Sequence, residues 1–273
     1  GAADFVNWYD AHPDFPRTWD LSAKEIAVIG NGNVALDVAR ILAKQPADML
    51  ATDIPENVYQ GLLSSNATDV HVFGRRGPAQ VKFTPLELRE ACDIEGVDTI
   101  VYDEDFKYDA GSQEAIDTNN QTRVMVNTLE SHRGKERTAA TKRLHLHFFS
   151  SPKEILGEDG KVTGLRIERT ELDGSGGVTG TGEIREFPVQ AVYRAIGYFG
   201  SELDSIPFDH KAGVITNAAG RVLDENGEHI PGVYATGWIK RGPIGLIGHT
   251  KSDAMETIAC VLEDKNTWWQ PAH

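Results

Sequence analysis

The glycine-containing segment VIGNGNVA at residues 28–35 constrains the fold of this chain more than any other part of the sequence. A mostly apolar run at residues 25–29 leads into it, and residues 33–44 then show the apolar spacing of a helix. The segment fits the pattern GxGxxA, in which glycine forms a tight turn and a small third residue, here Ala35, lets the helix pack closely. The sequence therefore predicts a strand, a tight turn and a helix in direct succession.

A second apolar run at residues 70–73 ends in the sequence GRRGP at residues 74–78. Strand, helix and strand in this order are typical of a parallel βαβ unit. Thr84, Pro85 and Glu87 then have the pattern of a helix start, with a capping hydroxyl, a first-position proline and a third-position carboxylate. A helix should therefore begin at this point.

The other predicted elements complete an α/β pattern. We predict helices at residues 2–9, 115–133 and 252–264, a third strand at 97–102, and two strands that end in glycine at 191–197 and 232–237. Two strands with alternating polarity, at 144–149 and 162–170, are assigned to a small antiparallel layer, and residues 174–182 to an exposed hairpin tip. We predict an α/β fold: a Rossmann-like parallel sheet flanked by helices, with a small antiparallel β layer.

Composition excludes several classes of protein. The chain has 273 residues and a formal net charge of −14, which disfavours nucleic acid as a partner. Its two cysteines, Cys92 and Cys260, lack disulfide-framework or zinc-ligand spacing and suit a reducing cytoplasm. No apolar run approaches the roughly 20 residues of a membrane span, and the N-terminal residues do not resemble a secretory signal.

The glycine turn predicts a dinucleotide site, because the free N–H groups of a helix N-terminus bind a pyrophosphate. NAD sites usually carry an acidic residue after the second strand, whereas this chain has Arg75 and Arg76 there. Two guanidiniums match a ribose 2′-phosphate in charge and in bidentate geometry, so we predict NADP. The distance from Gly32 exceeds the usual ~20 residues, so residues 45–66 are expected to be an insertion.

Four motifs in order resemble those of adrenodoxin reductase and its bacterial ferredoxin–NADP reductase relatives. The motifs are GNGNVALDVAR, GRRGP, ELRE and GWIKRGPIG, which begin at residues 30, 74, 87 and 237. The resemblance extends over nearly the whole chain. It implies a flavoprotein that passes a hydride from NADPH to FAD and then single electrons to an iron–sulfur ferredoxin.

The resemblance also implies roles for particular residues. The residues expected at the two cofactors are Gly30, Asn31, Gly32, Asn33 and Val34 at the pyrophosphate of NADP, Arg75 and Arg76 at its 2′-phosphate, Glu87 at its ribose side, and Trp238, Gly245, Leu246 and Ile247 at the FAD. Gly245 is also expected near the nicotinamide. No residue is assigned with certainty to catalysis. Glu90 is a candidate polar group beside the nicotinamide, with an exposed helix carboxylate as the equal alternative.

The same resemblance suggests a division of the chain and a docking surface. We expect a lead-in helix and linker over residues 1–20, an NADP-binding domain over 21–200 and a remnant of the FAD-binding domain over 201–273. Arg89 and Arg123 match family positions on a basic face that receives the acidic ferredoxin. A solvated helix surface is the alternative for these arginines.

The family's own glycine-rich turn for FAD is absent from these residues, so two functions stay open. One is the NADP-binding portion of a ferredoxin reductase that uses FAD in the full-length enzyme. The other is an isolated NADP-binding module without flavin or turnover, and on this basis we expect a colourless protein. A dehydrogenase with its own substrate is less favoured, because no convincing acid–base residue is evident.

Two other kinds of site are disfavoured. His145 and His147 alternate on one predicted strand and share a face, but no cysteine or acidic partner accompanies them at ligand spacing. Ordinary strand histidines explain them, so no metal site is predicted. The serines lack the GxSxG context of a hydrolase nucleophile.

Overall fold

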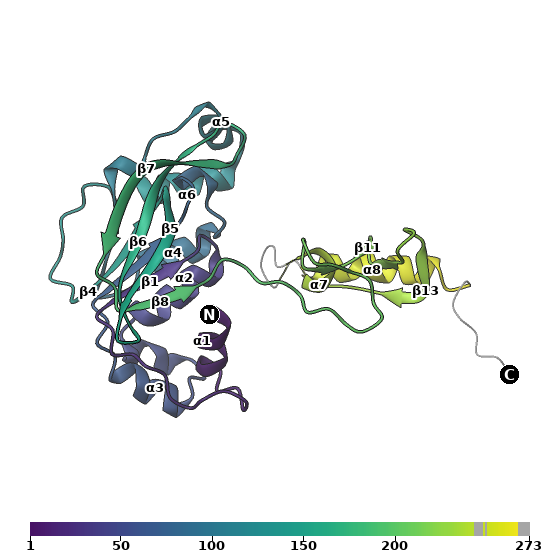
Figure 1. Ribbon diagram of the computed structural model, residues 1–273, viewed down its shortest axis with the longest axis horizontal. Helices are drawn as coiled ribbons and strands as arrows, with labels where there is room; N and C mark the ends of the chain where they lie inside the picture. Colours follow the sequence, from purple (N-terminus) through teal and green to yellow (C-terminus); the bar gives the residue numbers. More distant parts are fainter. Residues whose placement is uncertain (243–247, 249, 267–273) are drawn as a thin grey trace. The chain divides into compact units, whose positions relative to one another are not determined.

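The computed structural model describes residues 1–242, 248 and 250–266. The chain forms two compact units, Gly1–Ile196 and Gly197–His273, which we call the N-terminal and the C-terminal unit (Figure 1). The boundary lies close to the position 200/201 expected from the sequence. Helix α1 (Ala2–Tyr9) belongs to the N-terminal unit, because Phe5 and Trp8 on it are almost completely buried in that unit's core.

A five-stranded parallel sheet forms the middle of the N-terminal unit. Its strand order is β3 (Val97–Val101), β4 (Lys142–His147), β2 (Asp69–Phe73), β1 (Glu25–Ile29) and β8 (Ala191–Arg194). Each neighbouring pair is parallel. The predicted βαβ unit is confirmed, with α2 (Asn33–Ala43) between β1 and β2. The short helices η1 (Pro46–Ala51) and α3 (Glu56–Leu63) account for the long spacing before β2.

The two faces of this sheet have different coverings because side chains alternate along a strand. One face carries apolar pairs from β1, β2 and β4, and its core includes residues of α2, α4 (Pro85–Cys92) and α6 (Asn120–Glu130). The opposite face packs against an antiparallel sheet of β5 (Ser150–Glu158), β6 (Lys161–Leu172) and β7 (Val178–Phe187). In Figure 1 these three strands lie together on one side of the N-terminal unit. The predicted fold class, a helix-flanked parallel sheet with a small antiparallel layer, is confirmed.

Two predictions about the strands were wrong in detail. The strand expected at residues 144–149 is β4, and it pairs with β2 and β3 in the parallel sheet instead of the antiparallel layer. Its alternating pattern reflects a parallel strand with one apolar face and one histidine-bearing face. The hairpin tip is also shorter than the predicted 174–182, since β7 already begins at Val178.

Two predictions about the helices were also wrong. Residues 115–133 do not form one helix, because α5 (Ala110–Thr118) ends before Asn119, whose side chain accepts a hydrogen bond from the Thr122 N–H and starts α6. Helix α4 begins at Pro85 as expected, but the Thr84 hydroxyl makes no capping bond. The 3₁₀ helices η2 (Pro78–Gln80) and η3 (Asp103–Asp105) complete the N-terminal unit.

The C-terminal unit has a small core of its own. Strands β9 (Phe208–Asp209) and β10 (Val214–Ile215) form one antiparallel pair, and β11 (Asn217–Ala218), β12 (Arg221–Leu223) and β13 (His229–Tyr234) form a second antiparallel sheet. Helices α7 (Trp238–Arg241) and α8 (Thr250–Glu263) follow. None of the helices in the described ranges is long and apolar enough to cross a membrane.

Candidate functional site: two turns at one edge of the parallel sheet

The glycine turn after β1 and the arginine turn after β2 lie side by side. Ile29 and Phe73 are register partners at the ends of the two strands, and the Gly30 N–H donates to the Phe73 carbonyl at 3.0 Å. A Cβ atom built on Gly74 would lie 2.8 Å from Asn31 Nδ2. The absence of a side chain at residue 74 therefore lets the two turns contact each other directly.

Gly30 is required by the close packing of the turn. Its φ of +147° lies in a region that side chains rarely adopt, and an added Cβ would lie 2.1 Å from the Ala195 carbonyl oxygen. Ala35, the small third residue of the motif, is fully buried at the start of α2. These contacts bring the start of α2 close to the sheet edge, as the motif predicts.

The N-terminus of α2 is left open. The N–H groups of Gly32, Asn33 and Val34 donate to no acceptor in the part of the chain that the structure describes. Around Gly32 there is space, since the nearest atom to a built Cβ is Lys82 Cβ at 4.0 Å. Unbonded N–H groups together with the positive end of the helix dipole form a site suited to an anion.

The arginine turn has a bonded main chain and free side chains. The Arg75 carbonyl accepts from the Thr170 hydroxyl at 2.7 Å, and the Arg76 carbonyl accepts from the Phe149 N–H at 3.1 Å. Neither guanidinium forms a hydrogen bond or an ion pair with a residue in the described ranges. The turn therefore presents two cations beside the open helix end, in a chain whose net charge is strongly negative.

Lys82 was missed by the sequence analysis. Its N–H donates to the Asn31 carbonyl at 2.8 Å, which holds the exposed lysine beside the glycine turn. Asn33 Oδ1 accepts from the Thr84 N–H at 2.9 Å and joins the starts of α2 and α4. The only sequence signal for Lys82 was its place two residues before the predicted helix start.

The carboxylates of α4 differ in their surroundings. Glu87 has a buried Oε2 atom, and Thr84 a buried Oγ1 atom, that find no hydrogen-bond partner among the described residues. Glu90 is exposed and forms an ion pair with Arg40, which also binds Asp37 at 2.9 Å. The pairing with Arg40 favours the alternative interpretation of Glu90 as a surface carboxylate.

The predicted docking arginines lie on neighbouring helices. Arg89 on α4 and Arg123 on α6 are both exposed, and these helices pack against each other. Arg123 donates to Asn120 Oδ1 at 2.8 Å. Arg133, which follows α6 in the chain, binds Asp103 at 2.9 Å and lies over the Phe106 ring, so it serves an internal contact.

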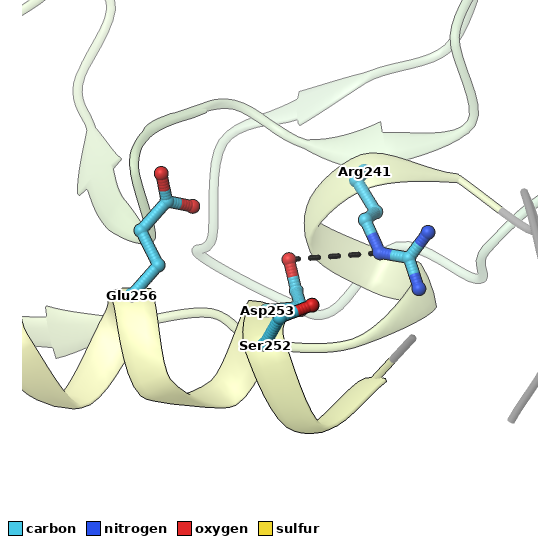
Figure 2. A pocket seen from close by; sticks show the side chains of 4 residues that line it. All are labelled: Arg241, Ser252, Asp253 and Glu256. Carbon is cyan, nitrogen blue, oxygen red and sulfur yellow. Dashed lines mark ion pairs between the residues drawn. The ribbon is translucent and has the colours of Figure 1, made fainter. Parts of the chain in front are cut away.

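The predicted flavin motif lies in the C-terminal unit. Trp238 at the start of α7 is 42% exposed. Gly245, Leu246 and Ile247 lie outside the described residues. Figure 2 shows a shallow hollow between α7 and α8, lined by Arg241, Ser252, Asp253 and Glu256. Arg241 Nε and Asp253 Oδ1 form an ion pair there at 3.6 Å.

Asp253 on α8 binds both the Gly237 turn and Lys240 of α7, although the sequence analysis did not select it. Its Oδ2 accepts from the Gly237 N–H at 2.5 Å, and its Oδ1 lies 3.2 Å from Lys240 Nζ. Burial acts to raise the pKa of Asp253, but the Gly237 bond and the Lys240 ammonium outweigh it and lower that pKa. Asp253 is therefore held as a carboxylate that binds the Gly237 N–H just before α7.

The chain is similar to several reductases over almost its whole length. It is 40% identical over 268 residues to the NADPH-ferredoxin reductase FprA of Mycobacterium tuberculosis, which covers 96% of this chain and 57% of that protein. It is 38% identical over 279 residues to the mitochondrial NADPH:adrenodoxin oxidoreductase of Mus musculus, covering 96% of this chain and 55% of the relative. The chain thus spans a little more than half the length of these relatives.

The fold is similar to that of solved reductases. The structure of Mycobacterium tuberculosis FprA in complex with NADPH matches with a TM-score of 0.87 and 39% identity, over 98% of this chain and 58% of that one. No family model matches the chain.

Proposed function

Because this chain belongs to the family of adrenodoxin reductases and bacterial ferredoxin–NADP reductases, we propose that it is the NADP-binding portion of an FAD-dependent ferredoxin–NADP oxidoreductase. The observation that carries the proposal is the pairing of an open helix N-terminus with two free guanidiniums at adjacent strand ends. An anionic pyrophosphate and a 2′-phosphate are the two charged groups of NADP that such a pair fits.

The proposed contacts follow from the geometry of the two turns. The N–H groups of Gly32, Asn33 and Val34 bind the pyrophosphate, and the open space at Gly32 lets the nucleotide approach the main chain. Arg75 and Arg76 bind the 2′-phosphate through charge-assisted hydrogen bonds. Lys82 adds a third cation beside the same turn.

Glu87 is proposed for the ribose side of the nucleotide. A buried carboxylate oxygen without a partner is costly unless a donor reaches it, and a ribose hydroxyl is such a donor. The Thr84 hydroxyl, at the start of α4, is also buried without a hydrogen-bond partner among the described residues. Glu90 is a second candidate, as a polar group beside the nicotinamide, but its carboxylate already pairs with Arg40.

The C-terminal unit is proposed as part of the FAD-binding domain. Its exposed Trp238, together with residues 245–247, would lie against the flavin. The bound cofactors would supply the redox chemistry, with a hydride passing from NADPH to FAD and single electrons then passing to a ferredoxin. The protein residues bind and orient the two cofactors.

Arg89 and Arg123 are proposed to receive the ferredoxin. Both guanidiniums are exposed on adjacent helices, so an acidic iron–sulfur protein can reach them. The cytoplasm is the proposed location, since both cysteines are free thiols. The second candidate function, an NADP-binding module without turnover, rests on the same open turn and differs in the absence of flavin.

Replacing Arg75 and Arg76 together by Ala tests the nucleotide assignment. Each charge-assisted bond lost should weaken NADP binding by roughly 1.5–3 kcal/mol, while the affinity for NAD changes little. Titration calorimetry with both nucleotides measures the difference. Arg137→Ala, an exposed arginine in a loop, is the matched control and should leave both affinities unchanged.

Equal losses for NADP and NAD in the double variant would contradict the 2′-phosphate assignment. The visible spectrum of the same purified samples separates the two candidate functions. Flavin absorbance in the wild-type chain supports the reductase portion with its flavin, and a colourless chain that binds NADP supports the module.

A further inference from the structure

Three histidines meet on the face of the parallel sheet that the antiparallel sheet covers. His71 comes from β2, and His145 and His147 come from β4. His71 and His145 are register partners, and His147 is the partner of Phe73. Each of the three histidines is only 6% exposed. The sequence showed the alternation within β4, whereas the parallel pairing with β2 adds the third imidazole.

The ring nitrogens are close enough to share a ligand. One nitrogen from each histidine lies within 4.8 Å of the other two, and His71 Nδ1 and His147 Nε2 are 3.0 Å apart. Zinc–nitrogen bonds are about 2.0–2.1 Å, so two nitrogens on one ion are separated by at most about 4.2 Å. The ring of His145 is stacked on that of His71, with centroids 4.2 Å apart, so His145 must turn to aim a nitrogen at the same ion.

Two carboxylates stand behind these imidazoles. Asp69 Oδ1 lies 2.9 Å from His145 Nε2, which leaves Nδ1 as the nitrogen that His145 can offer to a ligand. Glu25 Oε2 lies 3.7 Å from His71 Nε2, a buried atom without a hydrogen-bond partner in the described structure. Histidines that bind metals usually donate their second N–H to a carboxylate, which sets the ring orientation.

The Tyr102 hydroxyl is the remaining polar group at these imidazoles. It lies 2.9 Å from His145 Nδ1, so an ion bound to this nitrogen would displace that contact.

We propose that His71, His145 and His147 form a binding site for one divalent transition metal ion of the zinc class, with Asp69 and Glu25 as positioning residues. Three imidazoles without a thiolate suit zinc, nickel or copper better than magnesium or calcium, which prefer oxygen ligands. The proposed metal ligands are not among the residues proposed to bind NADP, so the test of this site does not depend on NADP binding.

The experiment titrates the metal-stripped full chain with Zn²⁺ by calorimetry and with Co²⁺ by visible absorption. We expect one ion for each chain, and X-ray absorption of the zinc form should show nitrogen neighbours at about 2.0–2.1 Å. Zinc should also raise the melting temperature, because an ion that binds only the folded state stabilises it. Sulfur neighbours, or no saturable binding by the wild-type chain, would overturn the proposal.

Variants locate the ion. His147→Phe keeps a ring against Phe73 and Tyr102. It removes a metal ligand and should lower zinc affinity by more than ~100-fold, the largest loss typical of removing a residue that only hydrogen-bonds a ligand. Asp69→Asn should lower it by roughly 10–100-fold.

His210→Phe replaces an exposed histidine and is the control, with unchanged affinity expected. If His147→Phe does not fold, judged by circular dichroism, Asp69→Asn and the X-ray absorption of the wild type decide the question. Wild-type affinity in folded His147→Phe would exclude the site.

Discussion

Two short glycine-led turns start helices in the two units, and they treat the helix N-terminus in opposite ways. At Gly30–Gly32 in the N-terminal unit, α2 has no acidic residue in its first turn, and the N–H groups that follow are unbonded within the described chain. At Gly237 in the C-terminal unit, the N–H is bound by the buried carboxylate of Asp253. An external anion can therefore bind the N–H groups of the first turn, whereas one of the chain's own carboxylates already binds the Gly237 N–H of the second.

This difference separates the turn that we propose to bind a nucleotide from a turn that is bonded within the chain. Both turns need glycine, since φ is +147° at Gly30 and +75° at Gly237. Of the two turns, the one at Gly30 has two cations on the neighbouring strand end, Arg75 and Arg76, whose side chains form no hydrogen bond or ion pair with a described residue. Around Gly237, Asp253 and Lys240 bind each other and hold α7 against α8. A glycine turn therefore indicates a ligand site only when its N–H groups remain unfilled.

The largest effect is expected for Gly30→Ala. The added Cβ would meet the Ala195 carbonyl oxygen at 2.1 Å in a strained conformation, so the free energy of unfolding should fall by roughly 3–5 kcal/mol. Because α2 must move away from the sheet edge, NADP binding should be lost. Urea unfolding and nucleotide calorimetry measure the two effects.

Gly237→Ala is the matched control for Gly30→Ala. No atom of a residue that the structure describes lies within 4 Å of its built Cβ, so backbone strain of roughly 1–3 kcal/mol is the expected cost. NADP affinity should stay at the wild-type value. Loss of NADP binding in Gly237→Ala, or its retention in Gly30→Ala, would break the comparison between the turns.

The next largest effect is expected for Asp253→Asn in the C-terminal unit. The Lys240 side chain is 5% exposed and that of Asp253 6%, so the substitution leaves the buried ammonium with an exposed carboxylate, Glu256, and neutral contacts to the Thr257 hydroxyl and the residue 253 carbonyl. We expect a loss of roughly 3 kcal/mol in the stability of this unit, measured by urea unfolding, with NADP affinity unchanged.

Glu256→Gln removes the other, 58% exposed partner of Lys240 and should cost less than about 1 kcal/mol. If the two substitutions destabilise the C-terminal unit equally, the buried carboxylate is not what holds α7. A fall in NADP affinity in Asp253→Asn would assign Asp253 to the nucleotide site instead.

The last expected effect is a loss of stability of the N-terminal unit at alkaline pH. Burial raises the pKa of Tyr193 to about 12 and that of Cys92 to about 12. The unfolded chain releases these protons near pH 9–10 while the folded chain keeps them. The free energy of unfolding should therefore fall above that pH until about pH 12, by up to about 1.4 kcal/mol for each pH unit and group.

Urea unfolding between about pH 8 and pH 11, followed by tryptophan fluorescence, measures this slope. Tyr193→Phe should give a shallower slope, although it is less stable near pH 8 because Trp19 Nε1 loses its acceptor at 2.8 Å. An unchanged slope in this variant would show that Tyr193 ionises normally in the folded protein.

The sequence was sufficient for features that depend on neighbouring residues. The strand, turn and helix around Gly30 and the helix start at Pro85 follow from local apolar spacing, glycine and proline. The pairing of β1 with β2 followed from their order, since a βαβ connection places its strands in parallel. The arginine turn was therefore expected at the same sheet edge as the glycine turn.

Strand partners and side-chain surroundings were beyond the sequence. The alternation in β4 could not show that this strand lies between β2 and β3, because residues 74–141 separate it from β2 along the chain. The cluster of His71, His145 and His147 depends on that pairing. Lys82 at the glycine turn and Asp253 at Gly237 also depend on contacts between distant segments.

The sequence by itself thus determined the α/β fold class, the glycine turn and the arginine turn, because local backbone preference and apolar periodicity encode them. Only the tertiary structure decided that the N–H groups at the start of α2 find no acceptor among the described residues while the Gly237 N–H before α7 is bound by Asp253. Whether an N–H group finds an acceptor depends on which side chain packs beside it, and that side chain comes from a segment distant in the sequence.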